Sequence, residues 1–227
     1  MYLGACEWGD SHPETWAGDY VQGYRVACDH LPFWEFPPEA AGDVCYGQGV
    51  KGMLENMAFL HPEKYVKPYA WMDADFLMTT YDPTMSHSDS RTEFSMWAMW
   101  SAPLITATDV RHMSHERKAI LSNTEVLAIH KDPLWQAAHL VANTTHGQIW
   151  ARPLHNGDLA VALINTHDFL PRAMAFDFAQ VGWHHSSASL RDLWDHKDLG
   201  VHSSRYASSV GPHDIHLLRL SPNQLQL

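Results

Sequence analysis

The chain is 227 residues long, which suits one large domain or two of ordinary size. Its 26 acidic residues outnumber 15 basic ones and leave a net charge of −11, so nucleic acid and anionic membranes are disfavoured as partners. Hydrophobic residues make up 45% of the chain, enough for a sizeable core. No run of about 18 apolar residues predicts a membrane span. Ten Trp and eight Tyr are many for this length, and a surplus of such rings often lines sites for sugar-like ligands, although most fill cores.

The first part of the chain alternates short apolar runs with helical patterns. Helices are expected over 47–60, over 90–102 with Ser90 and Glu93 as a capping box, and over 114–123. Short buried strands are expected over 1–8, 20–29, 67–78 and 102–110. This alternation predicts a parallel α/β layout, in which the chemistry lies at the carboxyl ends of the strands.

From about Gln136 the hydrophobic pattern changes to an alternation with period two. Six or seven short strands follow, and Asn156-Gly157 is a strong hairpin signal. We expect an antiparallel β-sandwich over 135–227 that serves for packing, with accessory sugar binding as the less favoured role. The first domain then covers 1–134.

Three cysteines, Cys6, Cys28 and Cys45, lie near the amino end. The odd count leaves at least one unpaired, and a Cys6–Cys28 or a Cys28–Cys45 bridge is equally compatible with the sequence. The amino end lacks the pattern of a signal peptide. The 17 histidines are scattered without the spacing of zinc ligands, so we predict no metal and no cofactor.

Four carboxylates follow the expected strand ends: Glu7, Asp29, Asp73 and Asp75. Glycoside hydrolysis needs one carboxylic acid to protonate the leaving oxygen and a second carboxylate as nucleophile or base. Asp29 is the best acid/base candidate, and Arg25, four residues earlier, could bind the sugar or form a structural ion pair with it. The other three could accept hydrogen bonds from sugar hydroxyls. The alternative for each is a helix N-cap or a loop charge in solvent.

Several segments together resemble the α-galactosidase (melibiase) family, glycoside hydrolase family 27. In the first part they are "CEWGDSHPETWA", "YRVACD", "WMDADFLM", "RTEFSMWAMWSAPLITATDVRHMS" and "LSNTEVLAIHKDPL". In the second they are "GDLAVALIN", "LRDLWDHKDLG" and "VGPHDIHLLRL". The resemblance covers nearly the whole chain.

The resemblance implies a (β/α)8 TIM barrel followed by a C-terminal antiparallel β domain. It implies a retaining enzyme that cleaves terminal α-D-galactosyl residues without a metal or cofactor. It also implies a secreted, vacuolar or lysosomal location and a full-length form that can be a homo-oligomer.

The family's acid/base is the Asp of an R-x-x-x-D segment, which implies Asp29, with Arg25 as a substrate-binding residue. By the same resemblance Asp75 contacts the sugar and Phe76 lies at the pocket wall. The family usually has Pro between the two aspartates of this segment, whereas this chain has Ala74.

The "CEW" segment implies that Glu7 and Trp8 face the sugar near its 2-position. Glutamate there goes with galactose, whereas relatives that accept N-acetylgalactosamine carry a small residue. The loop continues with Asp10, which makes it unlike the common types. A related pyranoside such as β-L-arabinopyranose is therefore an alternative substrate.

The family's nucleophile is an Asp at the end of the fourth barrel strand, and no segment before 1–8 supplies it. We therefore expect strands five to eight of the barrel plus the sandwich, in a chain that is inactive alone. A truncated gene model is the favoured explanation. The alternative is a non-catalytic carbohydrate-binding relic of the same fold.

Overall fold

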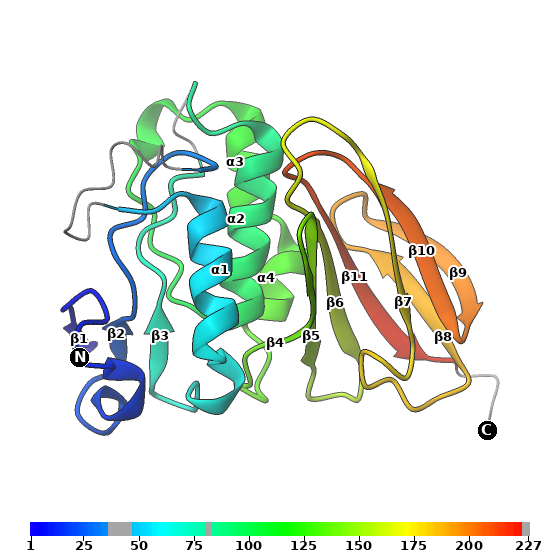
Figure 1. The fold of residues 1–227 in the computed structure, drawn as a ribbon, viewed down its shortest axis with the longest axis horizontal. Coiled ribbons are helices and arrows are strands. Elements are labelled where there is room, and N and C mark those ends of the chain that lie inside the picture. Colours follow the sequence, from blue (N-terminus) through cyan, green and yellow to red (C-terminus); the bar gives the residue numbers. More distant parts are fainter. Residues whose placement is uncertain (36–46, 80–82, 224–227) are drawn as a thin grey trace.

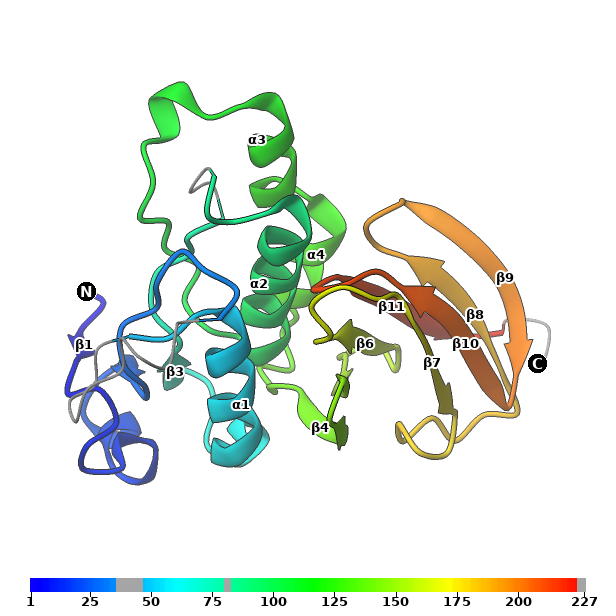
Figure 2. The same cartoon turned by 45° about the horizontal axis from the view of Figure 1, so that its top comes forward.

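The computed structural model describes residues 1–35, 47–79 and 83–223. A small parallel sheet, a layer of helices and a β-sandwich lie side by side in that order (Figures 1 and 2). The amino terminus lies beside the small sheet. In the described part of the chain, no helix has both the length and the apolar character needed to cross a membrane.

The small sheet has three short parallel strands, β1 (Gly4–Ala5), β2 (Gly23–Arg25) and β3 (Trp71–Asp73). Their order in the sheet is β1-β2-β3, with Ala5 opposite Tyr24 and Arg25 opposite Asp73. Since the strands are parallel and in sequence order, their carboxyl ends meet at one edge of the sheet.

The prediction of a strand over 102–110 is wrong. This segment forms one isolated parallel bridge, in which the Leu77 N–H donates to the Ile105 carbonyl at 2.7 Å and the Ala107 N–H donates to the Leu77 carbonyl at 3.2 Å. Pro103 has no N–H to offer a ladder, which limits the pairing at its start.

Within residues 1–35, 47–79 and 83–223, four α-helices form the middle layer, and the predictions over 47–60 and 114–123 are confirmed. They are α1 (Val50–Leu60), α2 (His87–Trp100), α3 (His115–Leu121) and α4 (Thr124–His130). Single 3-10 turns lie at Pro13–Thr15, Ala17–Asp19, Pro62–Lys64 and Val110–His112. Helix α2 is buried along almost its whole length, because it lies between α1 and the sandwich.

The predicted start of α2 is wrong by one turn. The N-cap is Ser86, and it forms a capping box with Asp89. The sequence holds two successive Ser-x-x-acid patterns, and the structure uses the earlier one. Ser90 is therefore interior and donates its hydroxyl to the Thr79 carbonyl at 2.7 Å, while Glu93 becomes a buried carboxylate.

The second part of the chain forms the predicted antiparallel sandwich. A six-stranded sheet has the order β4-β5-β6-β11-β8-β9, and a two-stranded sheet, β10-β7, packs on it. The strands are β4 (His139–Thr144), β5 (Gly147–Pro153), β6 (Leu159–Asn165), β7 (Arg172–Asp177), β8 (Ser187–Asp192), β9 (Lys197–Ser203), β10 (Arg205–Val210) and β11 (Ile215–Pro222). The hairpin at Asn156-Gly157 is confirmed: Gly157 has a φ of 85° and joins β5 to β6.

Strand β6 is buried on both faces and separates two cores. Its residues Ala160, Ala162 and Ile164 pack toward the helices, whereas Leu159 and Val161 pack between the two sheets. One strand therefore ties the sandwich core to the helical layer. The domain boundary after residue 134 stays a prediction; α4 ends at His130 and β4 begins at His139.

A fully buried arginine joins the sandwich to the end of α2. Arg152 of β5 donates from Nη1 to the Ala98 carbonyl in the last turn of the helix. A cation is favourable at that end of a helix dipole. Burial lowers the pKa of Arg152 to about 10, so the guanidinium keeps its charge at neutral pH.

A histidine of the sandwich holds the other end of α2. The two ring nitrogens of His213 lie 3.0 Å from Asp89 Oδ1 and 3.3 Å from Asp168 Oδ1, and the ring stacks on Trp34 with centroids 4.1 Å apart. The Thr92 hydroxyl donates to the His213 carbonyl at 2.7 Å. Both ends of the buried helix are therefore bonded to the sandwich.

We expect this contact to make stability depend on acid pH. Burial alone raises the pKa of Asp89, but hydrogen bonds from His213 and Ser86 outweigh it and leave the pKa below its ordinary 3.8. Folding then favours the ionised form of Asp89. Its contribution to the free energy of unfolding is complete above about pH 3.8 and is lost as the pH falls below that value. Asp89→Asn should lower the free energy of unfolding by about 1.5 kcal/mol at pH 6.

Urea denaturation at pH 6 and pH 3 measures this effect. The difference in free energy of unfolding between variant and wild type, called the gap here, should be smaller at pH 3 than at pH 6. Asp19→Asn is the control, since that side chain is 70% exposed. An equal gap at both pH values contradicts the assignment.

Candidate active site

The carboxyl ends of β1, β2 and β3 bring the predicted acidic residues to one edge of the small sheet. Glu7 follows β1, Asp29 follows β2, and Asp75 follows β3. The parallel register of the three strands is what places these segments side by side.

Arg25 lies at the centre of this group. Its Nη2 is 3.0 Å from Asp29 Oδ1 and 3.0 Å from Asp75 Oδ2, and its side chain is only 11% exposed. The structure thus has the ion pair with Asp29 that spacing alone left open, and it adds a second carboxylate. A guanidinium between two carboxylates fixes their relative positions through its planar geometry.

Asp29 is the most accessible acid of the group, with 53% of its side chain exposed. Its Oδ1 accepts from Arg25 Nη2 and from Trp8 Nε1, each at 3.0 Å. Both donors bind the same oxygen, Oδ1. No described residue donates a hydrogen bond to Oδ2, so this oxygen is left for solvent. A carboxyl held on one oxygen and open on the other can give and take a proton.

The loop after β1 is shaped to bring Trp8 across to Asp29. Trp8 and Gly9 both have positive φ, 58° and 86°. A Cβ at Gly9 would lie 2.5 Å from the Val26 carbonyl oxygen, so only glycine fits this close approach. Trp8 remains 46% exposed and presents its ring beside the acid.

Glu7 is turned toward its own loop and not toward Arg25. Its carboxylate accepts from the Ser11 N–H at 2.9 Å and from the Ser11 hydroxyl at 2.7 and 2.6 Å. Asp10 lies exposed on the same turn, where its N–H donates to the Glu7 carbonyl at 3.2 Å. In this structure Glu7 therefore shapes its own loop and caps no helix, since the next helical turn begins at Pro13 with His12 as its N-cap.

Asp75 is buried and fully engaged. Its Oδ2 accepts from the His30 N–H at 2.7 Å, its Oδ1 accepts from the Phe76 N–H at 2.8 Å, and its carbonyl accepts from Trp97 Nε1 at 2.8 Å. Its φ of 74° lies in the left-handed region, which Asp tolerates better than most residues. Phe76 is 46% exposed next to it.

Asp73 supports Asp75 from the last position of β3. Its Oδ1 accepts from the Asp75 N–H at 2.9 Å. Burial raises the pKa of Asp73, and neither that hydrogen bond nor the charge of Arg25 offsets the rise completely. This carboxyl is therefore more easily protonated than an ordinary aspartate.

Two residues that sequence reasoning missed lie directly behind this edge. His30 Nε2 lies 2.8 Å from Glu93 Oε1, and both side chains are 0% exposed. The sequence predicts Glu93 as part of a helix cap, and His30 is one of many scattered histidines. The only sequence signal for a role of His30 is its position directly after Asp29.

Cys28 is disulfide-bonded, whereas Cys6 is a free, exposed thiol. The Cys6–Cys28 alternative is therefore wrong, because the chain after β1 leaves Cys6 facing solvent. Cys45 lies outside the described residues. Among the described residues no three potential metal ligands gather into one group.

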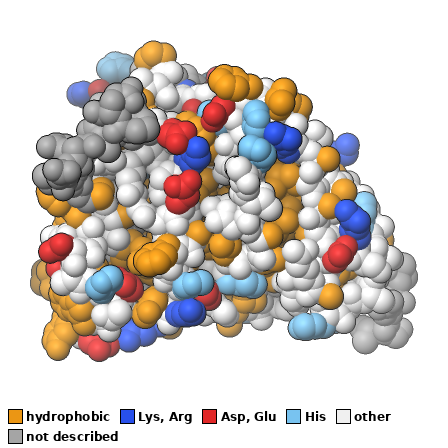
Figure 3. Space-filling view, in the orientation of Figure 1, with side chains coloured by type: hydrophobic (Ala, Val, Ile, Leu, Met, Phe, Trp, Pro, Cys, Tyr) orange, Lys and Arg blue, Asp and Glu red, His pale blue; other side chains and the backbone are white. Residues whose placement is uncertain are grey.

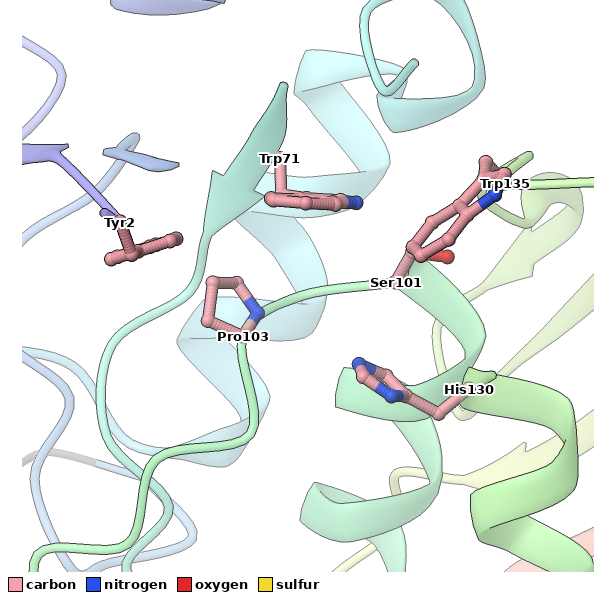
Figure 4. Close-up of a pocket in the computed structure, with 6 residues that line it drawn as sticks. All are labelled: Tyr2, Trp71, Ser101, Pro103, His130 and Trp135. Carbon is pink, nitrogen blue, oxygen red and sulfur yellow. The ribbon is translucent and has the colours of Figure 1, made fainter. Parts of the chain in front are cut away.

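A separate pocket of about 260 Å³ lies at the opposite end of the strands (Figure 4). It is lined by Tyr2, Trp71, Ser101, Pro103, His130 and Trp135. Trp71 begins β3, whereas Asp75 follows its end, so the pocket lies toward the end of the strand away from Asp75. The charge of Asp73 still reaches it, because burial and that charge together raise the pKa of the lining residue Tyr2. Among the described residues that line the pocket there is no carboxylate, and burial lowers the pKa of His130.

The face shown in Figure 3 has acidic, basic and histidine side chains interspersed among apolar ones. No single-sign patch extends over this face, so it has no electrostatic footprint for a polyanion. The carboxyl edge of the small sheet is therefore the best candidate for an active site.

Two family descriptions match the sequence: "Alpha galactosidase A" over residues 48–132 and "Alpha galactosidase C-terminal beta sandwich domain" over residues 144–220. An α-galactosidase of Oryza sativa subsp. japonica is 33% identical over 224 residues, covering 98% of this chain and 49% of the rice protein. The chain thus spans about half the length of this relative.

Solved structures share the fold. Alpha-galactosidase I from Mortierella vinacea superposes with a TM-score of 0.90 at 24% identity, over 98% of this chain and 59% of that one. A family 27 β-L-arabinopyranosidase from Geobacillus stearothermophilus, in complex with arabinose, gives 0.79 at 22% identity, over 94% and 48%. Family descriptions, relatives and fold agree along both parts of the sequence. The chain belongs to the α-galactosidase (melibiase) family.

Proposed function

We propose that this chain forms the acid/base half of a retaining glycoside hydrolase that cleaves terminal α-D-galactosyl residues. Its strands β1, β2 and β3 would be strands five to seven of a (β/α)8 barrel, with the segment 102–110 in the place of the eighth. The observation that carries the proposal is the Arg25 side chain 3.0 Å from both Asp29 and Asp75 at the carboxyl edge of the sheet.

Asp29 would act as the acid/base. Its accessible Oδ2 would protonate the leaving oxygen in the first step and remove a proton from water in the second. Arg25 and Trp8 hold its other oxygen at 3.0 Å, which fixes the direction of the carboxyl group.

The other acids of the edge support binding better than nucleophilic attack. Asp75 is engaged by Arg25 and His30, and Glu7 by Ser11. The nucleophile of a retaining enzyme must instead be free to bond the anomeric carbon. Its carboxyl group lies about 5 Å from the carboxyl group of the acid/base. We therefore propose that the nucleophile comes from a segment outside these 227 residues, while Asp75, Phe76, Trp8 and Arg25 contribute to sugar recognition.

A secreted, vacuolar or lysosomal location fits the same proposal. The disulfide at Cys28 supports it, because disulfides persist in oxidising compartments. The runner-up is a sugar-binding protein without catalysis, and the exposed Trp8 and Phe76 rings support that reading equally.

A chimera tests the acid/base role. The part of the rice α-galactosidase that precedes the matched region is joined to this complete chain, and hydrolysis of 4-nitrophenyl α-D-galactopyranoside is followed. Asp29→Ala should lower kcat by about 10²–10⁴-fold. Azide should restore turnover and yield the α-galactosyl azide, because azide attacks without a general base.

Asp19→Asn is the matched control and should leave kcat unchanged. A chimera that keeps full activity in Asp29→Ala would remove Asp29 from the mechanism. An inactive chimera that still binds galactose would favour the binding protein.

Sugar selectivity is a second measurement. We expect kcat/KM of the chimera for the α-D-galactopyranoside to exceed that for the β-L-arabinopyranoside by about tenfold or more, since lost contacts to the hydroxymethyl group cost about 1–3 kcal/mol. The 227-residue chain alone should hydrolyse neither. The reverse preference would move the assignment to the arabinopyranosidase class, which the Geobacillus structure represents.

A further inference from the structure

We propose that His30 and Glu93 form a buried positioning pair that holds the acid/base loop and the sugar-binding aspartate in register. The catalytic consequence rests on the proposed function, whereas the pair itself stands on geometry. The two side chains lie 2.8 Å apart with 0% exposure, although 63 residues separate them in the chain.

His30 connects the two loops that carry Asp29 and Asp75. It directly follows Asp29, and its own N–H donates to Asp75 Oδ2 at 2.7 Å. Its ring is fixed on both sides, with Nδ1 3.1 Å from the Gln48 carbonyl and Nε2 against Glu93. A ring that cannot rotate also fixes the backbone at position 30, and with it the base of the Asp29 side chain.

Glu93 fixes the second loop from the middle of α2. Its Oε1 accepts from the Met78 N–H at 2.6 Å as well as from His30, and its Oε2 accepts from the Thr79 hydroxyl. Met78 and Thr79 follow Asp75 along the chain by three and four residues. One carboxylate thus bonds both strand-end loops to a helix that the sandwich clamps at its two ends.

The hydrogen-bond pattern satisfies every polar atom of the pair. His30 Nδ1 faces the Gln48 carbonyl, which only accepts, so this nitrogen carries hydrogen. Nε2 and Glu93 Oε1 share one further hydrogen across 2.8 Å, and the Met78 N–H and the Thr79 hydroxyl donate to the same carboxyl group. Both side chains can therefore be buried without an unpaired polar atom.

Trp97 completes the arrangement. Its ring centroid lies 5.0 Å from that of His30, and its Nε1 donates to the Asp75 carbonyl at 2.8 Å. The two rings are tilted by 43° and pack against each other. Trp97 therefore contacts both the His30 ring and the Asp75 backbone.

The first test uses the complete 227-residue chain and needs no activity. The imidazole ¹⁵N signals of His30, assigned by comparison with His30→Phe, should show hydrogen on Nδ1 and a hydrogen-bonded Nε2, as the contacts to Gln48 and Glu93 require. In Glu93→Gln the Nε2 signal should move while Nδ1 keeps its hydrogen, since only the partner of Nε2 is changed. A His30 without hydrogen on Nδ1, or an Nε2 signal that does not respond to Glu93→Gln, overturns the pair.

The second test uses the chimera and two galactosides, one with the good leaving group 4-nitrophenol and one with a poor alkyl alcohol. A misplaced acid slows the poor leaving group more, whereas partial unfolding slows both equally. We compare kcat/KM for the galactoside with the poor leaving group to kcat/KM for the one with the good leaving group. This ratio should fall about fivefold in Glu93→Gln and about 20-fold in His30→Phe, because small displacements of a catalytic group lower the rate by up to about 100-fold.

Asp192→Asn is the matched control, since Asp192 Oδ2 lies 2.9 Å from His216 Nε2 in the sandwich, remote from the acids. It should leave the ratio unchanged. An unchanged ratio in Glu93→Gln and His30→Phe overturns the positioning role even where stability falls. Failure of the proposed function appears differently: the chimera is inactive, while the ¹⁵N signature of the pair persists.

Discussion

The buried carboxylate of Glu93 is the constraint around which the first part of the molecule is arranged. A carboxyl group without solvent contact is strongly unfavourable unless hydrogen-bond partners satisfy both oxygens, and removal of a single partner leaves one of them unpaired. Its donors come from His30 and from two residues after Asp75. Satisfying this one group therefore requires both loops of the candidate site to be in place.

Helix α2 transmits that requirement to the sandwich. The strands of the small sheet are only two or three residues long, so their own ladders hold the loops weakly. Helix α2 is bonded at its first turn to His213 and at its last turn to Arg152, both from the sandwich. The sandwich is thus linked to the site through helix α2, although among the described residues no hydrogen bond or ion pair joins the sandwich directly to Arg25, Asp29 or Asp75.

Sequence reasoning succeeded where the signal is local and failed where the decisive contact is distant. Period-two alternation, the Asn156-Gly157 turn and the Arg25–Asp29 spacing each involve neighbours in the chain, and the structure has all three. The helix start failed because two equivalent capping patterns lie four residues apart. Glu93 could not be found, since nothing near it in sequence distinguishes a surface cap from a buried acceptor for a residue 63 positions away.

The unequal environments of Asp29 and Asp75 divide their roles. Both touch the same guanidinium at 3.0 Å, yet Asp29 has 53% of its side chain exposed and Asp75 has 8%. Proton transfer needs an oxygen that substrate and water can reach, whereas recognition needs a carboxylate whose position and charge do not change. Because His30 bonds Asp75 through its backbone N–H while following Asp29 directly, the proposed acid/base and the proposed sugar-binding aspartate share one anchor. In the proposed arrangement, the distance between them depends on whether that anchor keeps its partner Glu93.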